Sequence, residues 1–310
     1  MNIIKNRYLY FGISLVVIIP GILALIFWHL PLGIDFTGGS LLEVKFDNGT
    51  PLSGDAVSAI YADYSVPSAA ISNPVVQPMG NDSLSIRSKV MDDATKSEII
   101  SQMESQSGST ITVLHFTQVS ASVGEEVAAR AAGAVALAAV AILLYITYAF
   151  RGVQHAFRYG TAAIIAMLHD VLVVVGVEAI LGHYLGWEAD SLFLTALLTV
   201  IGFSVHDSIV VFDRIRENSG HYKKLSYETL VNHSIVQTLD RSINTQLTVM
   251  ITLLALALFG GTSIRHFVVV LLVGVFSGTY SSIFNAAPIL VVWENKEWQN
   301  WFKRKSLTAQ

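Results

Sequence analysis

Six long apolar segments dominate this chain and restrict it to an integral membrane fold. A helix needs about 20 apolar residues to cross the hydrocarbon core of a bilayer. Such runs occur at about residues 8–30, 131–150, 159–181, 192–212, 243–259 and 267–293. Only 14% of the residues are charged, whereas soluble domains carry about 25%. We therefore expect a polytopic α-helical membrane protein with six transmembrane helices.

Basic residues indicate how the spans are oriented. They gather before the first span, in the loops after spans two and four, and after span six, whereas the opposite short loops hold only Arg265. Lys and Arg accumulate in cytoplasmic loops, so both termini are expected in the cytoplasm. The first apolar run ends in Phe-Trp-His-Leu-Pro at 27–31, which is no small-residue cleavage site. It is therefore expected to remain as a span.

The long segment between the first two spans is expected to form a small periplasmic domain. Its pattern predicts strands at 41–46, 71–77, 81–87 and 111–116 and helices at 53–64 and 93–107. The order β-α-β-β-α-β is that of a ferredoxin-like α+β domain. We therefore divide the chain into the N-terminus with span one (1–30), the periplasmic domain (31–130), spans two to six (131–293) and a cytoplasmic tail (294–310).

Several classes of function are disfavoured by what the sequence lacks. It has no cysteine, and its net charge of −4 is too weak to suggest a nucleic-acid partner. No residue pattern indicates a nucleophile arrangement, a metal site or a nucleotide-binding loop. We expect no enzyme activity, no catalytic residue, no metal and no cofactor, and binding or a mechanical role for the periplasmic domain.

A glycine-bearing segment, Gly-Ile-Asp-Phe-Thr-Gly-Gly at 33–39, directly follows the first span. Glycine permits tight turns that other residues disfavour. Gly38 and Gly39 are therefore expected to form a hinge or linker where the chain leaves the membrane. Asp35 belongs to the same linker or is a simple turn or capping residue.

Charged residues inside the spans are the strongest indication of function. Asp207 and Asp170 lie within apolar runs, and an ionisable group in hydrocarbon usually marks an ion or proton path. Arg241, at the start of span five, is the expected cationic partner of Asp207. The alternative for both aspartates is hydrogen bonding between helices. His206 is either a modulator of Asp207 or a polar packing residue.

Two further segments flank these spans on the cytoplasmic side. Asp213 opens a charge cluster that is either a modulator of the site or a solvated helix end. Residues 225–239 have the apolar spacing of a short amphipathic helix on the inner membrane surface. Asn-Ala-Ala-Pro at 285–288 predicts a kink in span six, because proline lacks a backbone donor.

Four motifs together resemble the SecF branch of the bacterial SecD/SecF protein-export family. They are the glycine segment at 33–39, Ile-Gly-Phe-Ser-Val-His-Asp-Ser at 201–208, Val-Val-Phe-Asp-Arg-Ile-Arg-Glu-Asn at 210–218 and Arg-Ser-Ile-Asn-Thr at 241–245. The resemblance covers essentially the whole chain. One departure is His206, where the family often has asparagine.

The resemblance implies a proton-motive-force-dependent accessory subunit of the Sec translocase in the bacterial inner membrane. It implies SecD as a heteromeric partner, contact with SecYEG and preprotein, and possible association with YajC and YidC. It also implies that Asp207 responds to protons, with Arg241 as its basic partner. Asp170 is a further candidate coupling residue because of its central position in span three, not because of the resemblance. Half of a proton-coupled small-molecule exporter and a translocon scaffold without proton use remain the alternatives.

Overall fold

The computed structural model describes residues 2–63, 74–153 and 155–301. The chain separates into two compact units. One comprises Met1–His29, Val135–Ile180 and Thr195–Gln310, and the other comprises Leu30–Ala134 and Leu181–Leu194. The expected tail at 294–310 lies largely outside the described residues.

The spans are formed by α1 (Arg7–Trp28), α5 (Ala121–Ala149), α6 (Ala156–Leu185), α7 (Ser191–His221), α8 (Tyr227–Phe259) and α9 (Thr262–Ser281), the last continuing through η2 (Ser282–Ala286) into α10 (Ala287–Glu294). Short helices η1 (Ile4–Asn6) and α11 (Trp298–Trp301) flank the series. In the described part of the chain, 6 helices are long and apolar enough to cross a membrane, as the sequence predicts.

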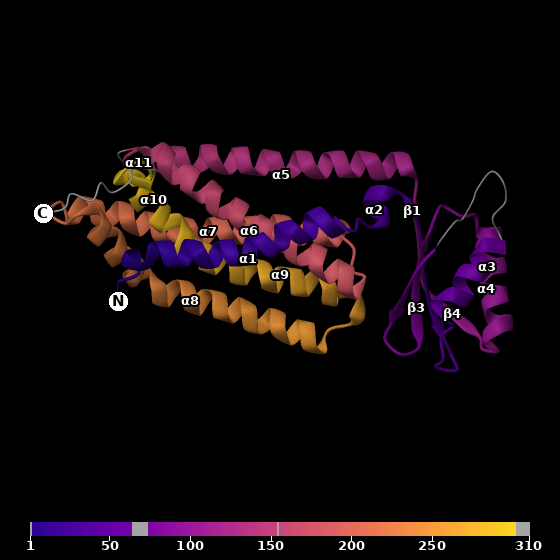
Figure 1. The fold of residues 1–310 in the computed structure, drawn as a ribbon. Helices are drawn as coiled ribbons and strands as arrows, with labels where there is room; N and C mark the ends of the chain where they lie inside the picture. The colour runs from indigo at the N-terminus through magenta and orange to yellow at the C-terminus, as the bar shows by residue number, and fades with distance from the viewer. Residues whose placement is uncertain (1, 64–73, 154, 302–310) are drawn as a thin grey trace, which may run out of the picture. The chain divides into compact units, whose positions relative to one another are not determined.

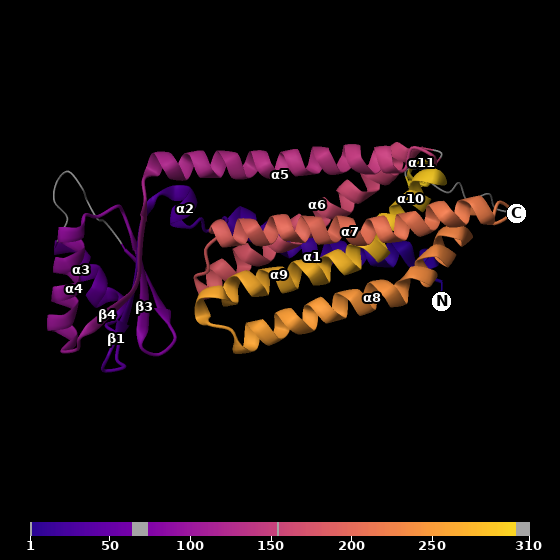
Figure 2. The same ribbon diagram turned by 180° about the vertical axis from the view of Figure 1, so that it is seen from behind.

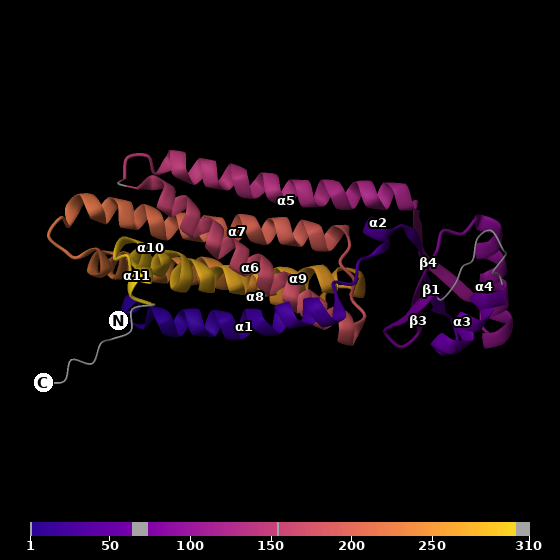
Figure 3. The ribbon, with the colours of Figure 1, turned by 45° about the horizontal axis from the view of Figure 1, so that its top comes forward.

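Three of these helices form the centre of the helical unit. Within their most apolar stretches, 44% of residues are buried in α6, 50% in α7 and 56% in α9 to α10, against 17%, 0% and 11% in α1, α5 and α8. The ribbons show α9 running between α7 and α8 (Figure 2) and α6 crossing its neighbours obliquely (Figure 3). The central helices are therefore where a polar group can be shielded from lipid. We call the end at which α8 stops and α9 begins the far end of the unit (Figure 1).

The amphipathic segment at 225–239 is not a separate surface helix. It forms the first turns of α8, which begins after Ser226 and runs without a break to Phe259. Leu230, Val231 and Ile235 are buried, and this part of α8 packs against α10 and η1. No proline or glycine lies between this segment and the apolar run that follows, so the helix continues.

The sixth span contains the expected irregularity. Residues Ser282–Ala286 form a π-helical turn, and Pro288 lies at the start of α10. Asn285 in this turn donates a hydrogen bond of 2.8 Å to the hydroxyl of Ser14 on α1. The turn thus gives a polar side chain a buried partner at the place where proline ends regular helical bonding.

The second unit holds an antiparallel sheet with the order β2-β3-β1-β4. Its elements are α2 (Ile34–Thr37), β1 (Gly39–Phe46), α3 (Gly54–Asp63), β2 (Val75–Met79), β3 (Ser83–Ser88), α4 (Asp93–Ser107) and β4 (Ile111–Val119). Every second residue of β1 from Leu42 to Phe46 is fully buried. The connectivity confirms the ferredoxin-like α+β domain.

The second strand lies further along the chain than its predicted position. Residues 71–73 of the prediction lie outside the described residues, and β2 extends to Met79 through Pro78. Pro78 lies just beyond the predicted strand at 71–77, but β2 includes it because β2 is an edge strand, where a missing backbone donor is tolerated. The turn is formed by residues 80–82.

Candidate functional site

Asp207 is buried on α7 and is bound by a side chain from another helix. The residue as a whole is only 3% exposed. The amide nitrogen of Gln246 on α8 donates a hydrogen bond to its Oδ2 atom. Gln246 Oε1 and the Ser208 hydroxyl are also buried, without a hydrogen-bond partner among the described residues. This incompletely paired cluster has unused capacity to exchange hydrogen-bond partners.

The structure does not bring Arg241 to Asp207. Arg241 is exposed, and no ion pair is recorded for its side chain within the described part of the chain. It precedes Gln246 by five residues, which rotates it by about 140° around α8. His206 is also exposed, and no hydrogen bond or ion pair joins it to Asp207 among the described residues. Gln246 was not predicted, since an uncharged amide in a polar stretch gives no distinct signal.

Asp170 lies at a junction of three central helices. It is completely buried on α6, and its carboxyl oxygens accept hydrogen bonds from serines of α7 and α9. These donors are Ser204 at 2.5 Å, Ser277 at 2.6 Å and Ser281 at 2.6 Å. The adjacent His169 places Nδ1 2.9 Å from Asp170 Oδ1. Thus the members of this His-Asp pair are in contact, unlike His206 and Asp207.

A third buried acid lies nearer the far end of the unit. Glu178 on α6 is completely buried, and His266 Nε2 on α9 lies 2.9 Å from its carboxyl oxygens. Glu178 follows Asp170 by eight residues, or about 12 Å of helix. A carboxylate within an apolar run is a signal that the sequence offered and that the prediction passed over. The central helices thus hold three buried carboxyl groups, a pattern suited to proton binding.

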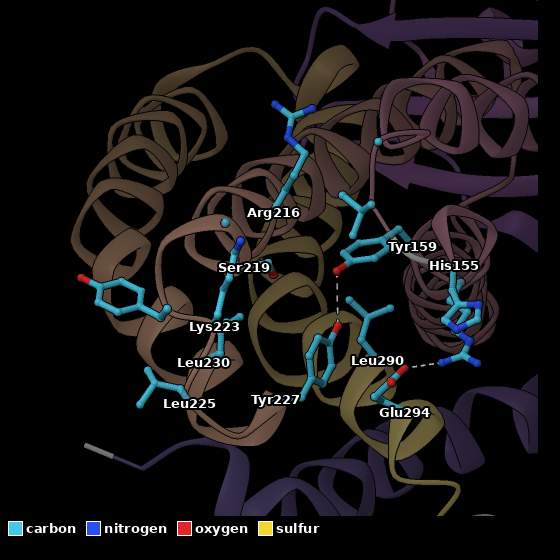
Figure 4. Close-up of a pocket in the computed structure, with 15 residues that line it drawn as sticks. His155, Tyr159, Arg216, Ser219, Lys223, Leu225, Tyr227, Leu230, Leu290 and Glu294 are labelled. Atoms are coloured by element: carbon cyan, nitrogen blue, oxygen red, sulfur yellow. Dashed lines mark hydrogen bonds and ion pairs between the residues drawn. The ribbon is translucent and has the colours of Figure 1, made fainter.

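Asp213 belongs to a different environment at the other end of α7. It is exposed and forms an ion pair of 2.5 Å with Arg216. Arg216 borders a cavity of about 560 Å³ together with Lys223 and the hydroxyl pair of Tyr159 and Tyr227 (Figure 4). Exposed ion pairs of this kind contribute at most about 1 kcal/mol. The geometry favours a solvated helix end for Asp213.

The second unit contains the glycine segment. Gly38 and Gly39 have φ values of 74° and 137°, which disfavour other residues. A Cβ atom on Gly38 would lie 2.6 Å from the Cα atom of Ala121, and one on Gly39 would lie 2.6 Å from the carbonyl oxygen of Ser88. Both positions therefore require glycine for conformation and for close backbone approach.

Replacing Gly39 with alanine is expected to destabilise this unit by about 3 kcal/mol, because backbone strain and overpacking each cost about 1–3 kcal/mol. Thermal unfolding of the purified chain, monitored through protease cleavage within the sheet, would measure the loss of stability. Gly49→Ala is the matched control, since Gly49 also has a positive φ of 74° but nothing within 4 Å of its added Cβ. Equal losses in the two variants would contradict the role of the Ser88 contact.

Asp35 links the glycine segment to the loop between α6 and α7. Its carboxylate accepts a hydrogen bond of 2.8 Å from the backbone nitrogen of Ser191, the first residue of α7. The backbone nitrogen of Gly33 also donates to the carbonyl oxygen of Ala189 at 2.7 Å. A carboxylate at a helix N-terminus pairs with otherwise free backbone donors. Asp35 therefore acts as a capping group, one of the alternatives expected from the sequence.

A half-buried ion pair holds the same loop against the sheet. Arg87 on β3 contacts the carboxylate of Glu188 at 2.6 Å and donates to the carbonyl oxygen of Leu32 at 2.8 Å. Burial raises the pKa of Glu188 to about 7, with the Arg87 guanidinium opposing this rise and Asp190 adding to it. Glu188 therefore changes protonation near neutral pH, which is unusual for a glutamate.

This raised pKa predicts a pH-dependent loop. The folded unit holds the Glu188 proton more tightly than an unfolded chain does, so the resulting stability is full below the ordinary pKa of 4.5 and is lost as pH rises through about 7. Hydrogen exchange at residues 186–190, corrected for intrinsic rates, is expected to be faster at pH 8 than at pH 6. Glu188→Gln should remove this difference, and its persistence in that variant would assign it to another group.

Comparison with known proteins decides the family. Residues 99–296, more than half of the chain, match the family described as protein export membrane protein SecD/SecF, C-terminal, and residues 29–50 match the SecD/SecF GG motif. The chain belongs to the SecD/SecF family. The GG motif includes Gly38 and Gly39, whose close contacts are described above.

The relatives agree with this assignment along the whole chain. The protein translocase subunit SecF of Anaerolinea thermophila is 56% identical, covering 100% of this chain and 99% of its own length. The SecDF subunit of Bacillus subtilis is 34% identical over 94% of this chain but only 38% of its own. The crystal structure of SecDF from Thermus thermophilus superposes with a TM-score of 0.81 and 32% identity, covering 95% of this chain and 39% of that one.

Proposed function

We propose that this chain is a SecF-type accessory subunit that uses the proton-motive force to assist preprotein translocation. The observation that carries the proposal is Asp207, buried within a span and bound by Gln246 of a different helix. Family membership directs this geometry toward protein export, since the full-length relatives are named SecF subunits of the protein translocase. The proposed role is mechanical coupling without enzymatic activity.

The proposed mechanism is a two-state change around Asp207. Adding a proton removes a charge from the space between α7 and α8 and turns an acceptor into a donor, which changes the bond to Gln246. Gln246 Oε1, which belongs to the amide already bonded to Asp207, then offers a new partner to the protonated form. Each charge moved across a potential of 100 mV supplies about 2.3 kcal/mol, enough to shift a two-state equilibrium appreciably. Asp170 and its serine donors couple this change to α6 and α9.

A SecD chain is the proposed partner. The relatives named SecDF contain the equivalent of this chain in a little over a third of their length, and SecD is the proposed source of the remainder. The outer helices α1, α5 and α8 expose most of their apolar surface, and α8 also exposes Arg241. We propose that a second half-bundle covers part of this surface and brings a partner to Arg241. Remaining contacts would be with SecYEG, YajC, YidC, preprotein and lipid.

The proposed location is the bacterial inner membrane, with both termini in the cytoplasm and the ferredoxin-like unit in the periplasm. The distribution of Lys and Arg supports this orientation. The far end of the helical unit would then face the periplasm. The segment of Asp35, Gly38 and Gly39 is the proposed joint through which changes in the spans reach the periplasmic unit.

The proposal is tested in bacterial membranes that lack the native SecF chain. This chain is co-expressed with SecD, and secretion of a reporter preprotein is followed before and after a protonophore removes the gradient. A gradient-dependent gain in export, together with co-purification of SecD, is the expected result. Export that gains nothing from this chain in energised cells, despite normal expression, would overturn the proposal. A change in tolerance to small toxic compounds instead would favour the exporter alternative.

A further inference from the structure

His169 has one ring nitrogen that the Asp170 cluster does not use. Its Nδ1 atom lies 2.9 Å from Asp170, but Nε2 is buried without a hydrogen-bond partner among the described residues. The residue as a whole is only 9% exposed. A buried imidazole nitrogen left unpaired is costly unless a water or another group reaches it.

A crevice reaches this histidine. It has a volume of about 410 Å³ and lies among α1, α6, α8 and α9. On α6 it is lined by His169, Val173 and Val177, which recur every four residues along one face toward the far end. Ser14 and Ser277 add hydroxyl groups to its wall. Both hydroxyls are already engaged, Ser14 with Asn285 and Ser277 with Asp170, which leaves Nε2 of His169 as the polar atom there that lacks a partner in the described part of the chain. A water that enters from the crevice would supply that missing partner.

A second crevice adjoins the first and reaches Gln246, the partner of Asp207. It has a volume of about 270 Å³ and shares three lining residues with the first, namely Met250, Phe276 and Tyr280. The two crevices together therefore border the sites of both Asp170 and Asp207. His169, the partner of Asp170, lines the first crevice, and Gln246, the partner of Asp207, lines the second. Of these two partners only His169 is able to carry a proton.

We infer that His169 is a relay that transfers protons between this crevice and Asp170, and this inference rests on the proposed proton-coupled function. A proton from a crevice water binds Nε2, and the proton on Nδ1 passes to Asp170 Oδ1. The ring is left neutral with its proton on Nε2. In the reverse step, Asp170 returns its proton to Nδ1 and Nε2 releases its proton to the crevice water, which restores the starting tautomer. No charge or atom is lost in this cycle.

The groups that face His169 from each neighbouring helix are compatible with this role. Asp170 adjoins it on α6, and the Tyr280 ring of α9 stacks on it with 6.2 Å between centroids. Asp207 on α7 is a further buried carboxylate, and it interacts electrostatically with Asp170. Ser14 lies on α1 and Met250 on α8. The relay thus has one acid beside it and no described cation competing for that acid.

The first test measures whether water enters the crevice. The chain has no native cysteine, so Val173→Cys and Val177→Cys each provide a single thiol that reacts with maleimide only where it is hydrated. Val174→Cys is the matched control, because Val174 is buried but does not line the crevice. In native membranes containing SecD, labelling at 173 and 177 is expected to be at least tenfold faster than at 174. Equally slow labelling at all three positions would overturn the relay.

The second test measures proton use. His169→Asn retains a side-chain amide that can bond to Asp170 but cannot carry a proton at neutral pH. We expect gradient-dependent export to fall about a hundredfold, the lower end of the range for loss of a positioned proton-transfer group, and its pH dependence to flatten. His155→Asn, which makes the same chemical change at an exposed residue away from the buried carboxyl groups, should keep the wild-type rate and pH profile. A wild-type rate and profile in His169→Asn, while Asp207→Asn is inactive, would overturn the relay alone. Wild-type export that ignores a protonophore would overturn the proposed function itself.

Discussion

Asp207→Asn is expected to abolish the gradient-dependent part of preprotein export. Asparagine has nearly the same shape as aspartate and keeps an oxygen that can accept the bond from Gln246. It cannot take up or release a proton near neutral pH, so the two states of the proposed cycle become one. We expect a loss of at least about a hundredfold, the lower end of the range for removal of a positioned proton-transfer group. Secretion of a reporter preprotein in energised cells, normalised to the amount of chain in the membrane, measures it.

The same helix provides a matched control for this substitution. Asp213→Asn makes the same chemical change six residues further along α7, at an exposed side chain that pairs with Arg216. Loss of an exposed ion pair costs at most about 1 kcal/mol. Export by Asp213→Asn should therefore equal that of the parent chain. Equal impairment of both variants would show that α7 is sensitive to any charge change, and normal export by Asp207→Asn would remove Asp207 from the mechanism.

Substitutions at Asp170 are expected to separate stability from coupling. Asp170→Leu leaves the Ser204, Ser277 and Ser281 hydroxyls without their shared acceptor in a buried place. A buried polar group without a partner costs about 1–3 kcal/mol, and serine can partly recover by bonding to its own helix. We expect a net loss of about 3 kcal/mol, seen as a lower unfolding temperature in detergent and a smaller folded yield.

Asp170→Asn should behave differently, because its amide oxygen still accepts and a serine hydroxyl can reverse to accept from its nitrogen. We expect it to fold with a loss of about 1 kcal/mol, similar to Ser277→Ala, which removes one bond of the cluster. Its gradient-dependent export should nonetheless fall, since asparagine does not carry the proton. Full export by Asp170→Asn would show that Asp170 serves only to hold α6, α7 and α9 together.

The spans and the sheet could be predicted because each depends on a pattern within a short stretch. The predicted helix at 93–107 coincides with α4, and the apolar runs place all six membrane helices. The prediction was wrong where the position of a strand at the sheet edge, or the continuation of a helix, outweighed the local sequence pattern. Pro78 lies within a strand because β2 is at the sheet edge, and the segment at 225–239 is part of α8 because nothing interrupts the helix.

The partners of the buried acids could not be predicted in the same way. Asp207 and Asp170 could be identified because a carboxylate stands out in an apolar run however the helix is rotated. Which side chain meets Asp207 depends on the rotation of α8 around its axis, and five residues of helix separate Gln246 from the expected Arg241. Three serines around one carboxylate likewise give no pattern in the sequence, because they come from two helices far apart along the chain.

The π-helical turn in the sixth span has a consequence for how that span transmits movement. Pro288 offers no backbone hydrogen, so the carbonyl group of Phe284 lacks its usual helical donor four residues later. A π turn also contains one residue more than an α-helical turn. Movement of this extra residue along the helix would rotate α10 about its axis relative to α9 without stretching bonds in the core. The span is therefore better suited to twist at Ser282–Ala286 than to push as a rigid rod.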